Sequence, residues 1–137
     1  MQDNELFSIT LGEDQIIRVL YGYQRRVTLK LVKSAVSQAS QLITVKHPLI
    51  VSGPNIIYLD YDAGKYQASQ EPAEIFSAVA VITRTRLEQT LGRMFMRIHK
   101  SNYPVRLFTT EAEAEKWLQI YLPSESAQSK PTPLIYA

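Results

Sequence analysis

The 137-residue sequence contains no cysteine, few glycines and only two histidines. Without cysteine it has no disulfide, no thiolate metal site and no cysteine nucleophile. His47 and His99 cannot form a zinc site alone, and the sequence has no acidic cluster that completes one. The five glycines form neither a P-loop nor a dinucleotide-binding motif, and there is no Gly-x-Ser-x-Gly elbow. We therefore expect a non-enzymatic protein. A hydrolase using His47 or His99 is the weakest hypothesis, because no nucleophile lies at a supporting spacing.

Long apolar runs are also missing, because the unbroken ones span a few residues and fall far short of a membrane span. The N-terminal Met-Gln-Asp-Asn-Glu lacks the basic and apolar regions of a signal peptide, so we expect a cytoplasmic protein. Fifteen Lys and Arg against 13 Asp and Glu leave a net charge of +2, too small for a general nucleic-acid binder. At 45% hydrophobic and 20% charged residues, the composition is that of one globular domain.

The apolar spacing predicts strands that alternate with helices after an initial hairpin. The expected strands are 5–11, 16–23, 56–60, 78–83 and 105–108, and the expected helices are 28–43, 69–76, 86–100 and 110–122. Residues 44–55 are expected to form a loop with a short extended piece, and residues 62–70 a second loop. Strand–helix alternation favours parallel pairing through right-handed crossovers. The prediction is an α/β fold: a single mixed five-stranded sheet with four helices, in the order β-β-α-β-α-β-α-β-α. It occupies residues 1–122, and the Ser/Pro-rich residues 123–137 form a loose C-terminal tail.

Two helix starts carry specific capping signals. Thr28 is a candidate N-cap for the first helix, and Thr110 with Glu113 three residues later predicts a capping box for the last one. The clearest helix, residues 86–100, carries one apolar stripe. The stripe consists of Leu87, Leu91, Met94, Phe95 and Ile98.

Three segments in the second half of the chain resemble small bacterial STAS-like (SpoIIAA-like) proteins of mostly unassigned function. The segments are Ala-Val-Ala-Val-Ile (78–82), Leu-Glu-Gln-Thr-Leu-Gly-Arg-Met-Phe (87–95) and Tyr-Pro-Val-Arg-Leu-Phe-Thr-Thr-Glu-Ala-Glu-Ala-Glu-Lys-Trp-Leu (103–118). The first half agrees in the order of its elements. The resemblance implies the fold, and that group has no catalytic motif to carry over.

Better-known STAS domains, which this layout also resembles, are regulators that dock on a partner, often a serine-kinase-like one. Docking uses the loop and helix after the third strand, and phosphorylation of a serine at the start of that helix alters the contact. The resemblance places Ser69 at the phosphorylated position and the recognition surface at residues 62–76. The expected partner-binding residues are Asp60, Asp62, Tyr66, Ser69, Glu71 and Glu74. The Asp-Ser-x-Gly signature that is usual in those STAS domains is absent here, since Gln-Glu-Pro follows Ser69.

Ser69 and a group of basic residues in the second half of the chain each have a functional and a plain structural interpretation. The reading that the sequence favours for Ser69 is an ordinary helix N-cap, a position that suits serine with or without a phosphate. Between residues 84 and 106 there are six basic residues and one acid. Four of the basic residues lie on one helix face that suits an anionic partner or a lipid head group, although a solvated helix face has the same pattern. They are Arg86, Arg93, Arg97 and Lys100.

Five of the eight tyrosines gather near strand ends and the loop that follows, namely Tyr21, Tyr23, Tyr58, Tyr61 and Tyr66. Tyrosines so placed anchor interfaces or line apolar pockets, and core packing accounts for part of the set. The leading hypothesis is a regulatory or protein-interaction module. The alternative is a carrier or sensor of a small apolar, lipid-like ligand, because SpoIIAA-like sheets are similar to those of Sec14-type lipid-binding domains. We expect no cofactor and no transmembrane segment, and a homodimer would cover an exposed edge strand.

Overall fold

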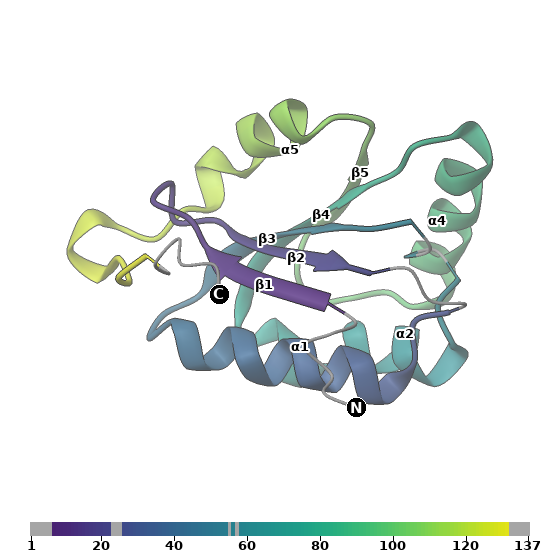
Figure 1. Ribbon diagram of the computed structural model, residues 1–137, viewed down its shortest axis with the longest axis horizontal. Coiled ribbons are helices and arrows are strands. Elements are labelled where there is room, and N and C mark those ends of the chain that lie inside the picture. The colour runs from purple at the N-terminus through teal and green to yellow at the C-terminus, as the bar shows by residue number, and fades with distance from the viewer. Residues whose placement is uncertain (1–6, 23–25, 55, 57, 132–137) are drawn as a thin grey trace.

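A computed structural model describes residues 7–22, 26–54, 56 and 58–131 of the chain. It contains one five-stranded sheet in the order β1-β2-β3-β4-β5 (Figure 1). The strands are β1 (Phe7–Leu11), β2 (Ile17–Tyr21), β3 (His47–Ser52), β4 (Phe76–Ile82) and β5 (Val105–Phe108). β1 and β2 form an antiparallel hairpin, and every later neighbour pair is parallel. The predicted mixed sheet is confirmed, with the hairpin at one edge and β5 at the other.

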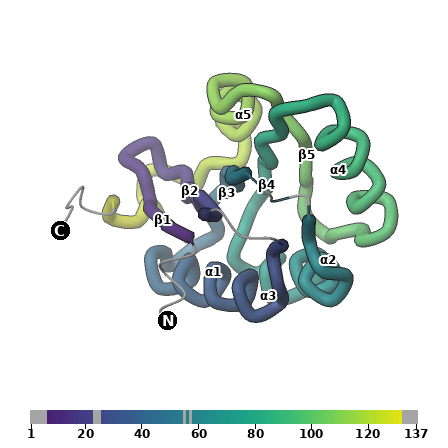
Figure 2. The backbone as a smooth tube through the Cα atoms, turned by 45° about the vertical axis from the view of Figure 1, so that its right-hand side comes forward, coloured from purple at the N-terminus to yellow at the C-terminus, as the bar shows by residue number. Residues whose placement is uncertain are grey.

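Helices cover both faces of this sheet. The helices are α1 (Leu29–Leu42), α2 (Tyr61–Gln67), α3 (Gln70–Ala73), α4 (Arg86–Ile98) and α5 (Glu111–Leu118), followed by 3-10 turns η2 (Gln119–Tyr121) and η3 (Glu125–Ala127). α1, α2 and α3 lie on one side and α5 on the opposite side, while α4 lies beside β5 at the end of the sheet (Figure 2). The hydroxyls of Thr28, Thr85 and Thr110 each accept the backbone N–H three residues on, which confirms the predicted N-caps at Thr28 and Thr110.

The two faces of the sheet have different cores because successive side chains of a strand point in opposite directions. On β4, Val79 faces the larger core under α1, whereas Ala78 and Ala80 face α5. These small alanines let Ala114 and Leu118 of α5 pack closely on the sheet. The larger core joins β1–β4 to α1, and the pocket described below lies beside it.

The third strand is not at 56–60, as the apolar run predicted, but at His47–Ser52. His47 is buried, and its ring is held by the Val45 carbonyl (2.8 Å) and the Gln15 side chain (3.1 Å). Gly53 has a φ of 145°, which ends the strand. Of residues 56–60, Leu59 forms one isolated parallel bridge with Val27. The predicted alternation of strands and helices survives because the extended piece within the expected loop is the strand itself, and α2 is added before the expected helix at α3.

Residues 62–70 are not a loop, because α2 occupies most of this segment. Ser69 occupies the N-cap position of the four-residue α3, as predicted, but its side chain makes no capping hydrogen bond. Part of the segment after Leu122 contacts the domain: Ser129 donates its N–H to Gln15 (3.0 Å) and accepts the Thr44 N–H (3.4 Å). Residues 132–137 of the predicted tail and Tyr23 lie outside the described residues.

Candidate functional site

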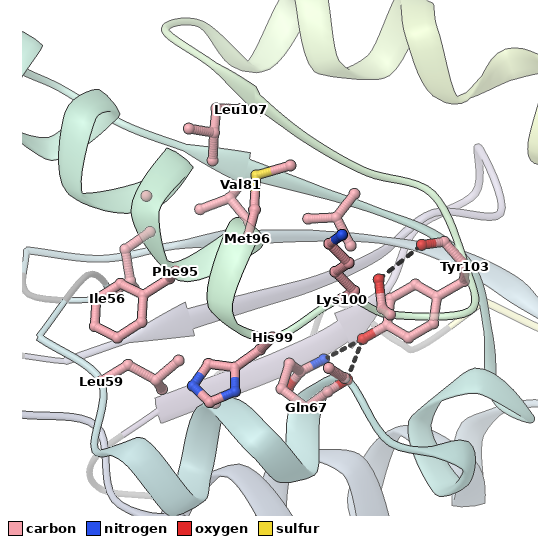
Figure 3. Close-up of a pocket in the computed structure, with 15 residues that line it drawn as sticks. Ile56, Leu59, Gln67, Val81, Phe95, Met96, His99, Lys100, Tyr103 and Leu107 are labelled. Carbon is pink, nitrogen blue, oxygen red and sulfur yellow. Dashed lines mark hydrogen bonds between the residues drawn. The ribbon is translucent and has the colours of Figure 1, made fainter.

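An open pocket of about 420 Å³ lies between α2, α4 and the ends of β4 and β5 (Figure 3). Its walls are mainly apolar. They include Ile56 and Leu59 from the loop before α2, Val81 from β4, Val105 and Leu107 from β5, and Phe95 and Met96 from α4. The pocket exists because α4 approaches the sheet closely at one residue. Gly92, the one buried residue of α4, packs against Leu107, where a Cβ atom would lie 2.9 Å from Leu107 Cδ1.

His99 closes the pocket on the α2 side. Its ring packs on Gly64, where a Cβ atom would lie 2.7 Å from His99 Cδ2. The ring also makes an edge contact with Tyr61 (4.8 Å between centroids) and stacks with Phe95 (6.4 Å). Among the described residues, neither ring nitrogen of His99 has a hydrogen-bond partner. A polar side chain is thus held at the pocket by packing, with its hydrogen-bonding capacity unused.

Tyr103 forms a satisfied polar group beside His99. Its hydroxyl donates to the Gln67 carbonyl and accepts from Gln67 Nε2 (3.1 Å), and Ser101 Oγ donates to the Tyr103 carbonyl (2.8 Å). Burial raises the pKa of Tyr103 to about 12, against the opposing effect of its hydrogen bond with Gln67. The phenol is therefore neutral at physiological pH, and it fixes α2 to the segment before β5.

A second cavity of about 120 Å³ lies inside the core next to the pocket. The two share six lining residues, namely Ile56, Leu59, Gln67, Val81, Tyr103 and Val105. Tyr21 also lines the inner cavity and is 6% exposed. No described residue hydrogen-bonds its hydroxyl, and burial raises its pKa well above the usual value. Buried hydroxyls without a partner are uncommon, so the Tyr21 hydroxyl is an exception among the described residues.

The four predicted basic residues are all exposed, but they do not form one helix face. Arg86, Arg93 and Arg97 lie on α4, whereas Lys100 lies beyond the end of the helix and lines the pocket. Within the described chain, no carboxylate lies within ion-pair distance of any of these four side chains. By contrast, Arg18 pairs with three carboxylates.

The apolar stripe of α4 is only partly covered. Leu91 packs against the larger core, and Phe95 lines the pocket. The other three members, Leu87, Met94 and Ile98, are 62%, 50% and 59% exposed. The sequence predicted the stripe correctly, but its period does not tell which part a neighbouring element covers.

The predicted partner-binding residues lie along α2 and α3, from Asp60 at the N-cap of α2 to Glu74 at the C-cap of α3. Several of them already have partners within the chain: Asp60 pairs with Arg26 (3.1 Å), the Tyr66 hydroxyl donates to Glu71, and the half-buried Ser69 hydroxyl donates to the Tyr66 carbonyl. Asp62 and Glu74 are exposed and make no ion pair with a described residue.

Sequence reasoning missed the pocket itself. Its apolar residues come from five separate segments, and the sequence pattern places each segment in a strand, a loop or a helix interior rather than at a common site. Among the described residues, no group of three His, Asp or Glu side chains is arranged to hold a metal ion. No described helix has the length and apolar character needed to cross a bilayer.

Comparison with known proteins places the fold. A family model described as a domain of unknown function (DUF7793) matches residues 9–122. No curated protein matches the chain. The crystal structure of an uncharacterized protein from the DUF3478 family with a SpoIIAA-like fold, from Shewanella loihica PV-4, is similar with a TM-score of 0.53. The two sequences are 14% identical, over 82% of this chain and 91% of that one.

A second structure, of a protein with unknown function from Arthrobacter sp. FB24, is 23% identical over 82% of this chain and 92% of that chain, with a TM-score of 0.31. The likeness to the Shewanella protein shows that the fold is SpoIIAA-like, which confirms the resemblance predicted from the sequence. At this identity the likeness concerns the fold alone, and function has to be argued from the site.

Proposed function

The chain belongs to the family described as a domain of unknown function (DUF7793), and from the geometry of its pocket we propose that the protein carries or senses a small amphipathic molecule. The observation that carries this proposal is the apolar cavity of about 420 Å³ between α2, α4, β4 and β5. Pockets for small ligands have volumes of roughly 300–1,000 Å³. An apolar group bound in this open pocket would remove its apolar walls from water, which is favourable in proportion to the area covered.

The ligand chemistry follows from the polar groups at the pocket. Lys100 contributes an ammonium group, and His99 contributes ring nitrogens without a described partner. An anionic head group would lie against these side chains, while an apolar tail occupies the wall formed by Val81, Val105 and Met96. The end of a longer apolar tail would enter the adjoining inner cavity. In this account the protein binds without catalysing a reaction.

The proposal is tested by calorimetric titration with octanoate, octanol and octyltrimethylammonium. These three probes share a tail and differ in head-group charge. We expect octanoate to bind tightest, because its carboxylate meets Lys100. Lys100→Gln should weaken octanoate binding roughly tenfold, the loss of one charge-assisted hydrogen bond, and leave octanol binding unchanged. Lys116→Gln removes an equally exposed charge from α5 and serves as the control. Equal binding of all three probes would contradict the proposed preference of the pocket for an anionic head group.

A second pair of variants tests the place of binding. Ala68 lines the pocket at the end of α2 and is partly exposed, so Ala68→Phe should fill the cavity without disturbing the core. Ala112→Phe introduces the same side chain at an exposed position on α5. We expect Ala68→Phe to abolish octanoate binding and Ala112→Phe to retain it. Binding that survives in both variants would show that the probe binds elsewhere.

A second candidate function is the regulatory protein-interaction module predicted from the sequence, and the exposed carboxylates of α2 and α3 favour it. Asp62 and Glu74 are free of described ion pairs and would suit a basic partner. The test is a tagged pull-down from the native host with alanine at Tyr66, Ser69 or Glu74, together with mass spectrometry of Ser69. A kinase-like partner lost in these variants would support the module, and an unmodified Ser69 with no partner would count against it.

A further inference from the structure

We propose that the outer surface of α4 docks on the anionic surface of a lipid bilayer. The docking surface consists of two rows of side chains on this helix: an apolar ridge (Leu87, Met94, Ile98) and a basic ridge (Arg86, Arg93, Arg97). The proposal concerns the outside of the helix, whereas the pocket lies on its inner side. It therefore goes beyond the proposed ligand and does not depend on it.

The apolar ridge is a row along one side of the helix. Its members are spaced by seven and four residues, which aligns them on that side, two turns and then one turn apart. Each exposes half or more of its side chain, although α4 is packed on the domain at Gly92. Single exposed apolar residues are common on proteins, but three in a row on one helix form a surface that favours burial.

The basic ridge runs beside the apolar one, about a quarter-turn around the helix. Its arginines have the same spacings of seven and four residues. No described carboxylate pairs with them, although Arg18 and Arg26 elsewhere in the protein are paired. The single acid of α4, Glu88, is occupied at the helix start, where it accepts the Arg84 N–H (2.8 Å). The outer surface of the helix is thus apolar and cationic, and no described carboxylate lies within ion-pair distance of its arginines.

A bilayer containing anionic lipids satisfies both ridges at once. Amphipathic helices with low overall hydropathy and basic polar faces lie in the plane of the interface, with apolar side chains among the acyl chains and cations on the head groups. A second copy of α4 in an antiparallel two-fold pairing fits less well, because that pairing would bring the two sets of arginines to the same side of the interface.

The test is flotation of the whole chain with vesicles of phosphatidylcholine alone or with phosphatidylglycerol at one third of the lipid. We expect binding to the anionic vesicles, a large loss at high salt, and little binding to the neutral ones. Met94→Gln with Ile98→Gln, and separately Arg93→Gln with Arg97→Gln, should each lower the bound fraction at least tenfold. Circular dichroism melting verifies that these surface variants remain folded.

Matched controls use equivalent side chains outside the docking surface. Ile120, 78% exposed, provides Ile120→Gln for the apolar change, and Lys30→Gln with Lys33→Gln on α1 removes two charges. Both controls should bind vesicles like the unaltered protein. Absence of binding to anionic vesicles, or an equal loss in the controls, would overturn the proposal. So would a dimer in light scattering that Met94→Gln with Ile98→Gln dissociates, because a second copy would then cover the ridge.

The pocket ligand and the docking surface of α4 can each be refuted without refuting the other. Octanoate titration of the α4 variants should give unchanged affinity, because none of the substituted residues lines the pocket. Vesicle binding without octanoate binding would leave the docking surface standing and refute the pocket ligand. Octanoate binding without vesicle binding would refute the docking surface alone.

Discussion

His99 and Gly64 form a close contact that joins the end of α4 to α2. A Cβ atom at position 64 would lie 2.7 Å from His99 Cδ2 and 2.9 Å from Nε2, closer than carbon atoms approach without displacement. A residue with no side chain is therefore what allows the imidazole to lie at the pocket. This contact fixes the position of His99 more than any hydrogen bond does.

Gly64→Ala should lower the free energy of unfolding by about 1–3 kcal/mol, because the added methyl group displaces His99. In a His99→Ala background the same change should raise the free energy of unfolding by up to about 1 kcal/mol, because alanine favours a helix interior more than glycine does. Urea denaturation of the four proteins measures both effects. The same sign of effect in both backgrounds would contradict the contact.

The two buried tyrosines should respond oppositely to loss of their hydroxyl groups. Tyr103 exchanges hydrogen bonds with Gln67, so Tyr103→Phe should lower the free energy of unfolding by about 1–2 kcal/mol. The Tyr21 hydroxyl has no described partner, so Tyr21→Phe should leave the free energy of unfolding unchanged or raise it by up to about 1 kcal/mol. Thermal melting of the two variants provides the comparison. A loss at Tyr21 as large as that at Tyr103 would mean that its hydroxyl is satisfied.

Asp14 links stability to pH through Arg18, which also contacts Glu111 (3.0 Å) and Glu115 (2.5 Å) of α5. Burial alone would raise the pKa of Asp14, but hydrogen bonds from Arg18 and the Ile16 N–H lower it below its ordinary value of 3.8. A carboxyl with a lowered pKa stabilises the folded state above its unfolded pKa and loses that effect as the pH falls through the folded one. At neutral pH the ion pairs of Arg18 therefore link the β1–β2 hairpin to α5.

Asp14→Asn should lower the free energy of unfolding at pH 7 by under about 1 kcal/mol, since the pair is partly exposed. The difference from the unaltered protein should shrink as the pH falls below 3.8, where Asp14 itself becomes protonated. Urea denaturation at a series of pH values measures this. A difference that grows toward low pH would contradict the direction of the pKa shift.

Local signals explain why so much of the fold is predictable from the sequence. Thr28 and Thr110 act as N-caps because a hydroxyl at that position satisfies a free N–H of the first turn, whatever the rest of the chain does. The apolar run 78–83 predicted a strand covered on both faces, and β4 packs against α1 residues on one face and α5 on the other. Where sequence-local chemistry decides, the prediction holds.

The errors arise where tertiary contacts decide. The run 56–60 is as apolar as a buried strand, yet β3 lies between β2 and β4, where its residues pair with strands far away in the sequence and His47 contacts Gln15, 32 residues away along the chain. α2 was missed because it is polar outside and contains Gly64, whose role is visible only against His99. The pocket depends on how far α4 stands from β5, and no periodicity in the sequence encodes that distance.

The most direct test of the ligand-binding account is a methyl NMR titration of the whole chain with octanoate. The account predicts saturable shifts in the methyl groups of Met96, Val81 and Val105, which line the pocket, with Leu20 and Ile120 unmoved at the same ligand concentrations. Shifts confined to Leu87 and Ile98 on the outer surface of α4, or none at Met96 and Val105, would contradict it.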